Sequence, residues 1–389
     1  MRYQSYLQTA VNIIGSYTGS LPLSVHLKQF FSAQKKYGST DRKQISTLCY
    51  HYYRLGKALR DMDTAQRVIL ACFLCEQQDS AFLQLHRPDW NAQIQLPAAE
   101  KCKLVVPPFD ITSIFPWGDH LSEGIPAASY AASFLQQPEL YLRIRPGHHD
   151  QVINKLQASN LSFREIGTST VALPNGSKLD ALLTLDQEVV VQDLHSQRVL
   201  DFLLPLVSEL PQPVQAWDCC AASGGKSILL YDLLKGKVEL TVSDIRKSIL
   251  VNLENRFARA GIHAAHAFVA DISGAERPNN AISNYSLILC DVPCTGSGTW
   301  SRTPEQLMGF KLATIADFAQ RQQQIVSGAI PHLQAGGLLV YITCSVFRQE
   351  NEAMLDFIKQ KFHLQLLQVE FWKGHDNKAD SMFAAVFKK

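Results

Sequence analysis

The stretch Asp218-Cys219-Cys220-Ala221-Ala222-Ser223-Gly224-Gly225-Lys226-Ser227 decides the fold predicted for this chain. The apolar run at 214–218 predicts a strand, and the apolar spacing at 225–235 predicts a helix. The small residues between them let a ligand approach the backbone, and the start of the helix offers unpaired N–H groups. The stretch therefore predicts a ligand-binding turn between a strand and a helix.

The same alternation of strand and helix continues toward the C-terminus. Strands are expected at 238–243, 267–270, 286–290 and 337–343, and helices at 246–260, 315–332 and 350–362. Strands that alternate with helices of this length predict a doubly wound, Rossmann-like α/β sheet. Pro331 lies inside one helical pattern and is expected to kink or end that helix, since proline lacks the backbone donor.

Four aspartates lie at the ends of four consecutive predicted strands. They are Asp218, Asp244, Asp271 and Asp291. The carboxyl ends of parallel strands share one edge of the sheet, where open α/β sheets bind ligands. A single aspartate there is commonly a helix cap, but four in register favour a binding edge. Asp244, at the tip of the second strand, is placed to accept both ribose hydroxyls of a nucleoside ligand.

A phosphate-binding loop is an alternative interpretation of the turn. Gly225-Lys226-Ser227 is typical of the end of such a loop, and Asp291 could then hold magnesium. The loop needs its first glycine at the position of Cys220, and a Cβ there obstructs the wrap around the phosphates. A P-loop-like NTPase is therefore the less favoured hypothesis.

Two further regions precede the α/β region. Residues 1–125 contain little glycine, and their apolar spacing, for example at 40–62 and 63–76, predicts helices. Residues 138–205 combine short strand patterns with one helical pattern, which predicts a small α+β subdomain. We therefore expect an all-helical domain at 1–125, an α+β subdomain at 138–205 and a Rossmann-like α/β domain at 206–389.

Composition excludes several classes of protein. Apolar residues make up 46% of the 389 residues and charged residues 19%, enough for a buried core and too apolar for disorder. Nine cysteines are too sparse for a disulfide scaffold, which favours reduced thiols in the cytosol. Because no apolar stretch is long enough to span a bilayer and no signal-peptide pattern is present, we expect a cytoplasmic protein without membrane association.

Charge is distributed unevenly along the chain. The formal net charge is only +2, yet residues 27–60 contain a single acid, Asp41, among many basic residues. Such density is typical of a phosphate-binding face, although a solvated helical face with acidic partners elsewhere has the same pattern. The basic residues of this segment are Lys28, Lys35, Lys36, Arg42, Lys43, Arg54, Lys57 and Arg60.

Two cysteines lie at strand ends beside the predicted crevice. Cys294 follows Asp291-Val292-Pro293, and Cys344 follows the strand at 337–343. A thiolate in a crevice is a candidate nucleophile, and the polar neighbours of both residues favour function over packing. Cys72 and Cys75 form a C-x-x-C pair, but no second pair follows at zinc-site spacing, so we expect no metal.

Taken together, residues 138–389 resemble the Nop/Sun-type, RsmB-like RNA 5-methylcytosine methyltransferases, which use S-adenosylmethionine. The matching blocks are 218–227, Asp244, Asp271, 291–298 and 341–345 with 350–352. The pairing of a Pro-Cys with a Thr-Cys segment is highly specific to this family. Segment 41–54 resembles the NusB-like RNA-binding domain of bacterial members, which favours ribosomal RNA as the partner.

The resemblance implies a role for each matched residue. Cys344 would add to carbon 6 of a flipped cytosine, Cys294 would assist the later elimination, and Asp291 would hydrogen-bond the ring edge. Asp244 would hold the cofactor ribose and Asp271 its adenine end. The basic segment and the Arg143/Arg145 strand would hold RNA phosphates. The rest of the implied cofactor site is Cys220, Ala221, Ala222, Ser223, Gly224, Gly225 and Lys226, together with Asp291.

One departure from the family pattern concerns the turn. Ser223 stands where the family usually has proline, so the turn geometry is permitted but not imposed by the residue. A second hypothesis is a non-catalytic RNA-binding or ribosome-assembly factor on a methyltransferase fold. Both cysteines and all four aspartates are present, which favours the enzyme. We expect the protein to act as a monomer.

Overall fold

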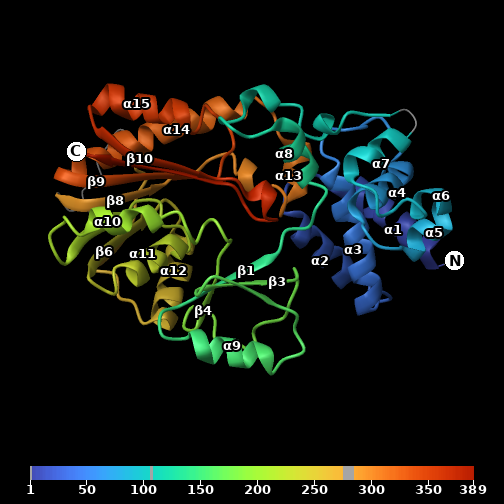
Figure 1. The fold of residues 1–389 in the computed structure, drawn as a ribbon, viewed down its shortest axis with the longest axis horizontal. Helices are drawn as coiled ribbons and strands as arrows, with labels where there is room; N and C mark the ends of the chain where they lie inside the picture. The colour runs from blue at the N-terminus through green and yellow to red at the C-terminus, as the bar shows by residue number, and fades with distance from the viewer. Residues whose placement is uncertain (1, 106–107, 275–283) are drawn as a thin grey trace. The chain divides into compact units, whose positions relative to one another are not determined.

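The computed structural model describes residues 2–105, 108–274 and 284–389 (Figure 1). The chain forms two compact units. The helical unit comprises Met1–Gln137 and Thr299–Leu312, and the sheet unit comprises Pro138–Gly298 and Ala313–Lys389. The sequence did not indicate that Thr299–Leu312, which interrupts the α/β region, belongs with the N-terminal helices. Among the described residues, no helix is both long and apolar enough to span a bilayer.

The helical unit buries the apolar faces of its longer helices. In α1 the buried Leu7, Ala10 and Ile14 lie three and four residues apart, and α4 begins where Asp63 accepts the Gln66 N–H. The helix expected at 40–62 ends earlier, at Arg54, because Gly56 two residues later has a left-handed φ of 48°. The helices are α1 (Arg2–Ser16), α2 (Leu23–Ala33), α3 (Ser39–Arg54), α4 (Thr64–Cys75), α5 (Ala81–His86), α6 (Pro88–Asn91), α7 (Ala98–Leu104), α8 (Ala127–Ser133) and α13 (Pro304–Gly309), with 3-10 turns η1 (Ile111–Ile114) and η2 (Gly118–His120).

Two basic residues of the 27–60 segment serve the fold of the helical unit. The buried Arg54 guanidinium donates to the carbonyl oxygens of Phe134, Gln136 and Ser301 at 2.8, 2.9 and 3.1 Å. Lys57 Nζ donates to two carbonyl oxygens of the 299–312 segment at 2.6 and 2.9 Å. The prediction that these two belong to a phosphate-binding face was therefore wrong. The other six basic residues of the segment are exposed.

The sheet unit contains a small antiparallel sheet. Its strands are ordered β2 (Arg164–Ile166), β3 (Thr170–Leu173), β1 (Leu140–Ile144) and β4 (Val189–Val191). Helix α9 (His149–Gln157) packs Val152 and Leu156 against Leu142 and Val171 of this sheet. The strands and the helix agree with the short patterns expected in this part of the chain.

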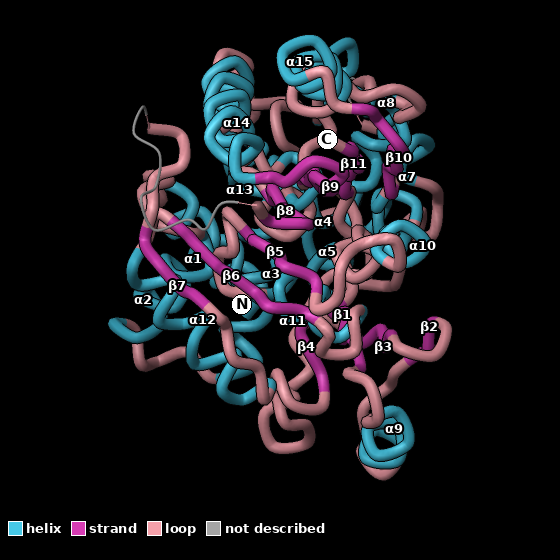
Figure 2. Tube along the Cα trace, turned by 90° about the vertical axis from the view of Figure 1, so that its left-hand side faces the viewer, coloured by secondary structure: helices cyan, strands magenta, loops and turns pink. Residues whose placement is uncertain are grey.

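The larger sheet has seven strands, and five of them are parallel (Figure 2). The parallel strands are β5 (Val214–Asp218), β6 (Val238–Asp244), β7 (His266–Val269), β8 (Tyr285–Asp291) and β9 (Leu333–Thr343). β10 (Gln365–Trp372) and β11 (Met382–Lys388) complete it as an antiparallel edge. The order is β10-β11-β9-β8-β5-β6-β7, so the direction of winding reverses between β5 and β8. The predicted doubly wound α/β sheet is confirmed.

Helices cover both faces of the larger sheet (Figure 1). On one face lie α10 (Leu204–Val207), α11 (Gly225–Leu233) and α12 (Lys247–Ala260), and on the other α14 (Thr314–Ala329) and α15 (Glu352–Phe362). Side chains alternate along each strand, so Leu287 and Leu289 pack toward the first group while Ile288 packs toward the second. The long helix ends before Pro331, as expected. The remaining 3-10 helices are η3 (Asp201–Leu203), η4 (Ser297–Thr299), η5 (Ile330–His332) and η6 (Gly374–Asp376).

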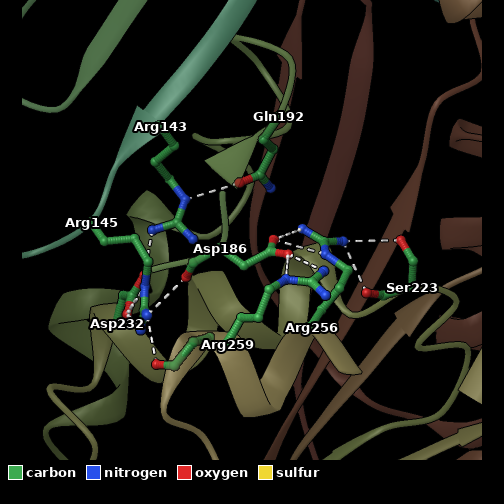
Figure 3. Close-up of polar contacts among 9 residues, drawn as sticks. Arg143, Arg145, Asp186, Gln192, Ser223, Asp232, Arg256 and Arg259 are labelled. Carbon is green, nitrogen blue, oxygen red and sulfur yellow. Dashed lines mark hydrogen bonds and ion pairs between the residues drawn. The ribbon is translucent and has the colours of Figure 1, made fainter. Parts of the chain in front are cut away.

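Two arginines join the small sheet to helix α11, which covers the larger sheet (Figure 3). Arg143 and Arg145, at the end of β1, both form ion pairs with Asp232 of α11, at 2.6 and 2.7 Å. Their side chains are only 6% and 10% exposed. The prediction that they hold RNA phosphates was wrong, because a buried arginine already neutralised by a carboxylate cannot reach a phosphate.

We predict that Arg54→Met destabilises the helical unit by about 3 kcal/mol, because it leaves several buried carbonyl oxygens without donors. Urea denaturation followed by circular dichroism measures the change, and hydrogen exchange of α3 and α4 amides assigns it to the helical unit. The matched control is Lys43→Met on the same helix, where the side chain is exposed and we expect a change within about 0.5 kcal/mol. Equal midpoints for the two variants would contradict the prediction.

Candidate functional site

The ends of four neighbouring parallel strands form the candidate site. β8, β5, β6 and β7 lie side by side, and Asp291, Asp218 and Asp244 are the last residues of the first three. Asp218 does not face a ligand: it is 1% exposed and accepts a hydrogen bond from Ser227 Oγ at 2.6 Å. Burial raises the pKa of the Asp218 carboxyl to about 7. Asp218 is therefore a buried residue that stabilises the turn through Ser227, and it does not lie on the binding edge where it was expected.

The turn between β5 and α11 is tied to the neighbouring strand. Ala222 N–H donates to Asp244 Oδ2 at 3.1 Å, and Ala221 N–H donates to the Ser243 carbonyl at 2.9 Å. Gly224 has a φ of 83°, and a Cβ there would lie 2.9 Å from the Phe257 ring of α12. Only glycine combines this left-handed conformation with such close packing. Cys220, Ser223, Gly225 and Lys226 stay partly exposed, while Ala221 and Gly224 are buried.

Asp244 and Asp271 differ in their surroundings. Asp244 is 6% exposed, and Arg246 donates to it from its backbone N–H at 2.9 Å and from its guanidinium at 3.1 Å. Sequence reasoning missed Arg246, although a basic residue two positions after a strand-end aspartate was a visible signal. Asp271 is exposed and lies two residues beyond β7, where its Oδ1 accepts from Ser273 N–H at 3.0 Å. Within the described residues, Asp271 forms no hydrogen bond or ion pair with another predicted site residue.

Lys226 and Asp291 form an ion pair across the point where the winding reverses. Lys226 Nζ lies 2.6 Å from Asp291 Oδ2, and the two side chains are 14% and 26% exposed. Burial by itself lowers the pKa of Lys226, but the charge of Asp291 and the hydrogen bond between them outweigh burial and raise it. Lys226 is therefore a fixed positive charge beside the candidate catalytic aspartate.

The two predicted cysteines meet at the ends of adjacent strands. Cys294 follows β8 and Cys344 follows β9, and their Sγ atoms are 3.3 Å apart. The hydrogen bond with Cys344, and then burial, raise the pKa of the Cys294 thiol well above its usual value. Both side chains remain partly accessible. The structure thus brings together two thiols that are 50 residues apart in the chain.

A buried carboxylate that sequence reasoning did not assign lies behind both cysteine turns. Glu350 is fully buried, and it accepts hydrogen bonds from Thr295 N–H at 2.9 Å, from Thr295 Oγ1 at 2.6 Å and from Ser345 Oγ. Gln322 of α14 donates to the same carboxylate at 2.9 Å. Burial raises the pKa of Glu350. The residues that follow Cys294 and Cys344 are thereby held by one side chain. In the sequence, the adjacent polar pair Glu350-Asn351 was the signal that could have indicated Glu350.

Close backbone packing also fixes the Cys344 turn. Gly298 N–H donates to the Cys344 carbonyl at 2.8 Å, and Ser381 N–H donates to the Gly298 carbonyl at 2.9 Å. A Cβ at Gly298 would lie 2.4 Å from the Ser381 carbonyl oxygen. The second glycine of the Cys-Thr-Gly-Ser-Gly segment is therefore required by close approach of two other chain segments.

One group of potential metal ligands lies within the helical unit. Donor atoms of His51, Cys72 and Glu76 lie within 4.8 Å of one another, and it is the one such group found among the described residues. The second cysteine of the C-x-x-C pair is not part of the group. The candidate active site itself contains the acids, thiols and Lys226 described above.

Comparison with known proteins agrees with this geometry. Residues 209–387 match the family model of 16S rRNA methyltransferase RsmB/F. A probable ribosomal RNA small subunit methyltransferase B of Synechocystis sp. is 30% identical over 62% of this chain and 53% of that protein. The chain thus spans about half the length of the curated relatives it matches.

Solved structures share the fold. PH0851 matches with a TM-score of 0.72 and 17% identity, over 99% of this chain and 98% of that chain. NSun6 from Pyrococcus horikoshii with SFG matches with a TM-score of 0.58 and 18% identity, over 72% of this chain and 98% of that chain. Over its sheet, glycine turn and cysteine segments, the region 209–387 is therefore similar to the methyltransferase domain of the RsmB/F family.

Proposed function

We propose that this protein is an S-adenosylmethionine-dependent RNA (cytosine-5)-methyltransferase that acts on ribosomal RNA. The observation that carries the proposal is the pair of thiols, Cys294 and Cys344, 3.3 Å apart at the ends of adjacent strands. Asp291 is the last residue of β8, which Cys294 follows, and it pairs with Ile342 of β9, which Cys344 follows. Two reduced thiols beside a carboxylate suit a reaction that forms a covalent adduct and later breaks it.

The chemistry explains why a thiol is needed. Carbon 5 of cytosine is a weak nucleophile, and addition of the Cys344 thiolate at carbon 6 makes the ring enamine-like and carbon 5 electron-rich. S-adenosylmethionine, when bound, supplies the electrophilic methyl group. Asp291 hydrogen-bonds the ring edge, and the positive charge of Lys226 beside it stabilises the negative charge that the ring gains during addition. Removal of the carbon 5 proton and cleavage of the Cys344–carbon 6 bond then release the product.

Cys294 suits the elimination step. A thiol with a raised pKa keeps its proton in the resting enzyme, and its thiolate is correspondingly basic. Once Cys344 is bonded to carbon 6, Cys294 releases its proton to solvent. The Cys294 thiolate then accepts the carbon 5 proton, so that the electrons of the broken C–H bond return to the ring and expel Cys344 as a thiolate. The contact of 3.3 Å allows a proton to pass between the two sulfur atoms before the substrate binds.

The turn and the strand ends supply groups that fit S-adenosylmethionine. Asp244 offers a carboxylate for the ribose hydroxyls, and the start of α11 offers N–H groups for the methionine carboxylate. A Cβ built at Gly225 meets no atom within 4 Å, so there is open space beside the turn. Asp271 is assigned to the adenine end, and ribose binding requires the exposed Arg246 side chain to leave Asp244.

RNA binding is assigned to the exposed part of the basic segment. After Arg54 and Lys57 are excluded, the remaining candidates are Lys28, Lys35, Lys36, Arg42, Lys43 and Arg60. The names of the curated relatives support ribosomal RNA. The NusB-like character of residues 1–125, the three-domain division, the monomeric state and the cytoplasmic location stay predictions.

Two other hypotheses are less well supported. A P-loop-like NTPase does not agree with the family match, and Lys226 is engaged by Asp291. A non-catalytic assembly factor does not account for two thiols in contact at the candidate site.

We predict that Cys344→Ala lowers methyl transfer by about a thousandfold or more while leaving S-adenosylmethionine binding unchanged, because only the nucleophile is removed. Bisulfite sequencing of ribosomal RNA measures 5-methylcytosine in cells that carry the wild type or the variant as their only copy. Cys75→Ala, in the helical unit, is the matched control and should retain the modification. Full modification by Cys344→Ala would exclude Cys344 as the nucleophile.

We predict that Cys294→Ala accumulates a covalent protein–RNA adduct, because addition proceeds and elimination is impaired. A slow-migrating species on a denaturing gel, sensitive to ribonuclease, reports the adduct. The double variant Cys294→Ala/Cys344→Ala should form none, since it lacks the thiol that makes the bond. Retained turnover without an adduct would assign elimination to another residue.

We predict that the wild type binds S-adenosylmethionine and not ATP, and that Asp244→Asn weakens binding about 10- to 100-fold through loss of charge-assisted hydrogen bonds. Isothermal titration calorimetry measures both ligands. Glu239→Gln, at an exposed position of the same strand, should leave the affinity unchanged. Binding of ATP alone would revive the NTPase hypothesis.

A further inference from the structure

Arg256 of α12 contacts the cofactor turn at the residue that departs from the family pattern (Figure 3). Its Nη1 donates to the Ser223 carbonyl at 2.9 Å and to Ser223 Oγ at 3.1 Å. The Arg256 side chain is 18% exposed, so these bonds form in partly desolvated surroundings. One guanidinium nitrogen therefore holds both the backbone and the side chain of Ser223.

Asp186, which precedes β4 of the small sheet, fixes the other side of Arg256. Arg256 donates to a single oxygen, Asp186 Oδ1, from Nε at 2.9 Å and from Nη2 at 2.7 Å. Arg259 binds the second oxygen of the same carboxylate, at 2.7 Å. Burial alone would raise the pKa of Asp186, but its bonds to the two arginines outweigh burial and lower it. Asp186 is thus a buried anion that orients Arg256.

Asp186 is itself held by its backbone. Its N–H donates to the Val189 carbonyl at 2.7 Å, and its carbonyl accepts from Arg145 at 3.0 Å. The chain of contacts from the small sheet through Asp186 and Arg256 to Ser223 is therefore anchored at each step.

The turn needs an external constraint. Ala222 and Gly224, on either side of Ser223, have φ values of 45° and 83°. A left-handed conformation costs a residue with a Cβ roughly 1–2 kcal/mol. A serine between these two positions does not restrict the backbone dihedral angles of the turn. A proline at 223 would restrict φ and reduce the freedom of the open turn. Within the described residues the Ser223 N–H forms no hydrogen bond that proline would remove.

We propose that Arg256 is a positioning residue of the cofactor turn, and that its two bonds to Ser223 supply the constraint that proline supplies at this position in the family. The inference rests on the proposed binding of S-adenosylmethionine by the turn. The proposal makes the affinity for the cofactor depend on Asp186, which precedes β4 of the small sheet, whereas the turn follows β5 of the larger sheet.

The structure offers a matched control for the test. Arg259 binds the same carboxylate from the same helix, but it has no bond to the turn. Arg256→Met should weaken S-adenosylmethionine binding about tenfold, the scale of one to two hydrogen bonds. Arg259→Met should change the dissociation constant less than about twofold, although both variants lower the melting temperature.

Rescue by proline separates positioning from general loosening. Ser223→Pro placed in the Arg256→Met background should bring the dissociation constant back to within about twofold of the wild type, because the turn is again restricted. The same substitution should not restore the melting temperature lost with the Asp186 contact. Calorimetry gives the dissociation constants, and differential scanning calorimetry gives the melting temperatures.

Hydrogen exchange at the amides of 222–225 in the free protein tests the positioning without any ligand. Exchange should be faster in Arg256→Met than in Arg259→Met. If the wild type bound no S-adenosylmethionine while this difference persisted, the proposed cofactor would fail and the positioning role would stand. Equal affinities and equal exchange in the two variants would overturn the inference. If Arg256→Met does not fold, Arg256→Lys, which has one nitrogen and cannot bind Asp186 and Ser223 with separate nitrogens, is compared with Arg259→Lys by the same measurements.

Discussion

The candidate site depends on the parallel pairing of β9, β8, β5 and β6. The order of the strands reverses between β5 and β8, and open α/β sheets bind ligands at such a point, beyond the carboxyl ends of the strands. The ion pair of Lys226 with Asp291 spans this point, because Lys226 lies in the first turn of the helix after β5 and Asp291 ends β8. A partly buried charge is stable only while its partner remains, so this pair couples the glycine turn to the first cysteine segment.

Access, rather than distance, distinguishes the cysteines proposed to be catalytic from those packed in the core. Cys219, which directly follows β5, and Cys290, in the neighbouring strand β8, also place their sulfur atoms 3.3 Å apart. These two residues are 1% and 0% exposed and pack in the apolar core, so no substrate can reach them. Cys294 and Cys344 lie beyond the strand ends, where Glu350 binds the residue that follows each of them. The same short contact is therefore a packing contact in one place and a candidate catalytic pair in the other.

Two buried aspartates connect the small sheet to the helices of the larger one. Asp232 is paired with Arg143 and Arg145, and Asp186 with Arg256 and Arg259. A carboxylate removed from water needs opposite charge and hydrogen bonds in return, and here each carboxylate receives them from two arginines. Arg143 and Arg145, which the sequence predicted to bind RNA, therefore neutralise a carboxylate within the sheet unit. Arg256 extends the connection from Asp186 to Ser223.

The sequence by itself determined the order of the elements, the doubly wound sheet and the two cysteine segments, because strand and helix periodicity and glycine turns are local properties. It placed Cys294, Cys344, Asp244 and Asp291 near strand ends, since the parallel sheet brings such ends to one edge. It could not assign Glu350, Arg246 or Arg256, nor show that Asp218, Arg54, Arg143 and Arg145 are buried. Those roles depend on partners distant in the chain, such as Asp232 for Arg143 or Thr295 for Glu350, and only the tertiary structure decides which charges meet and which remain in water.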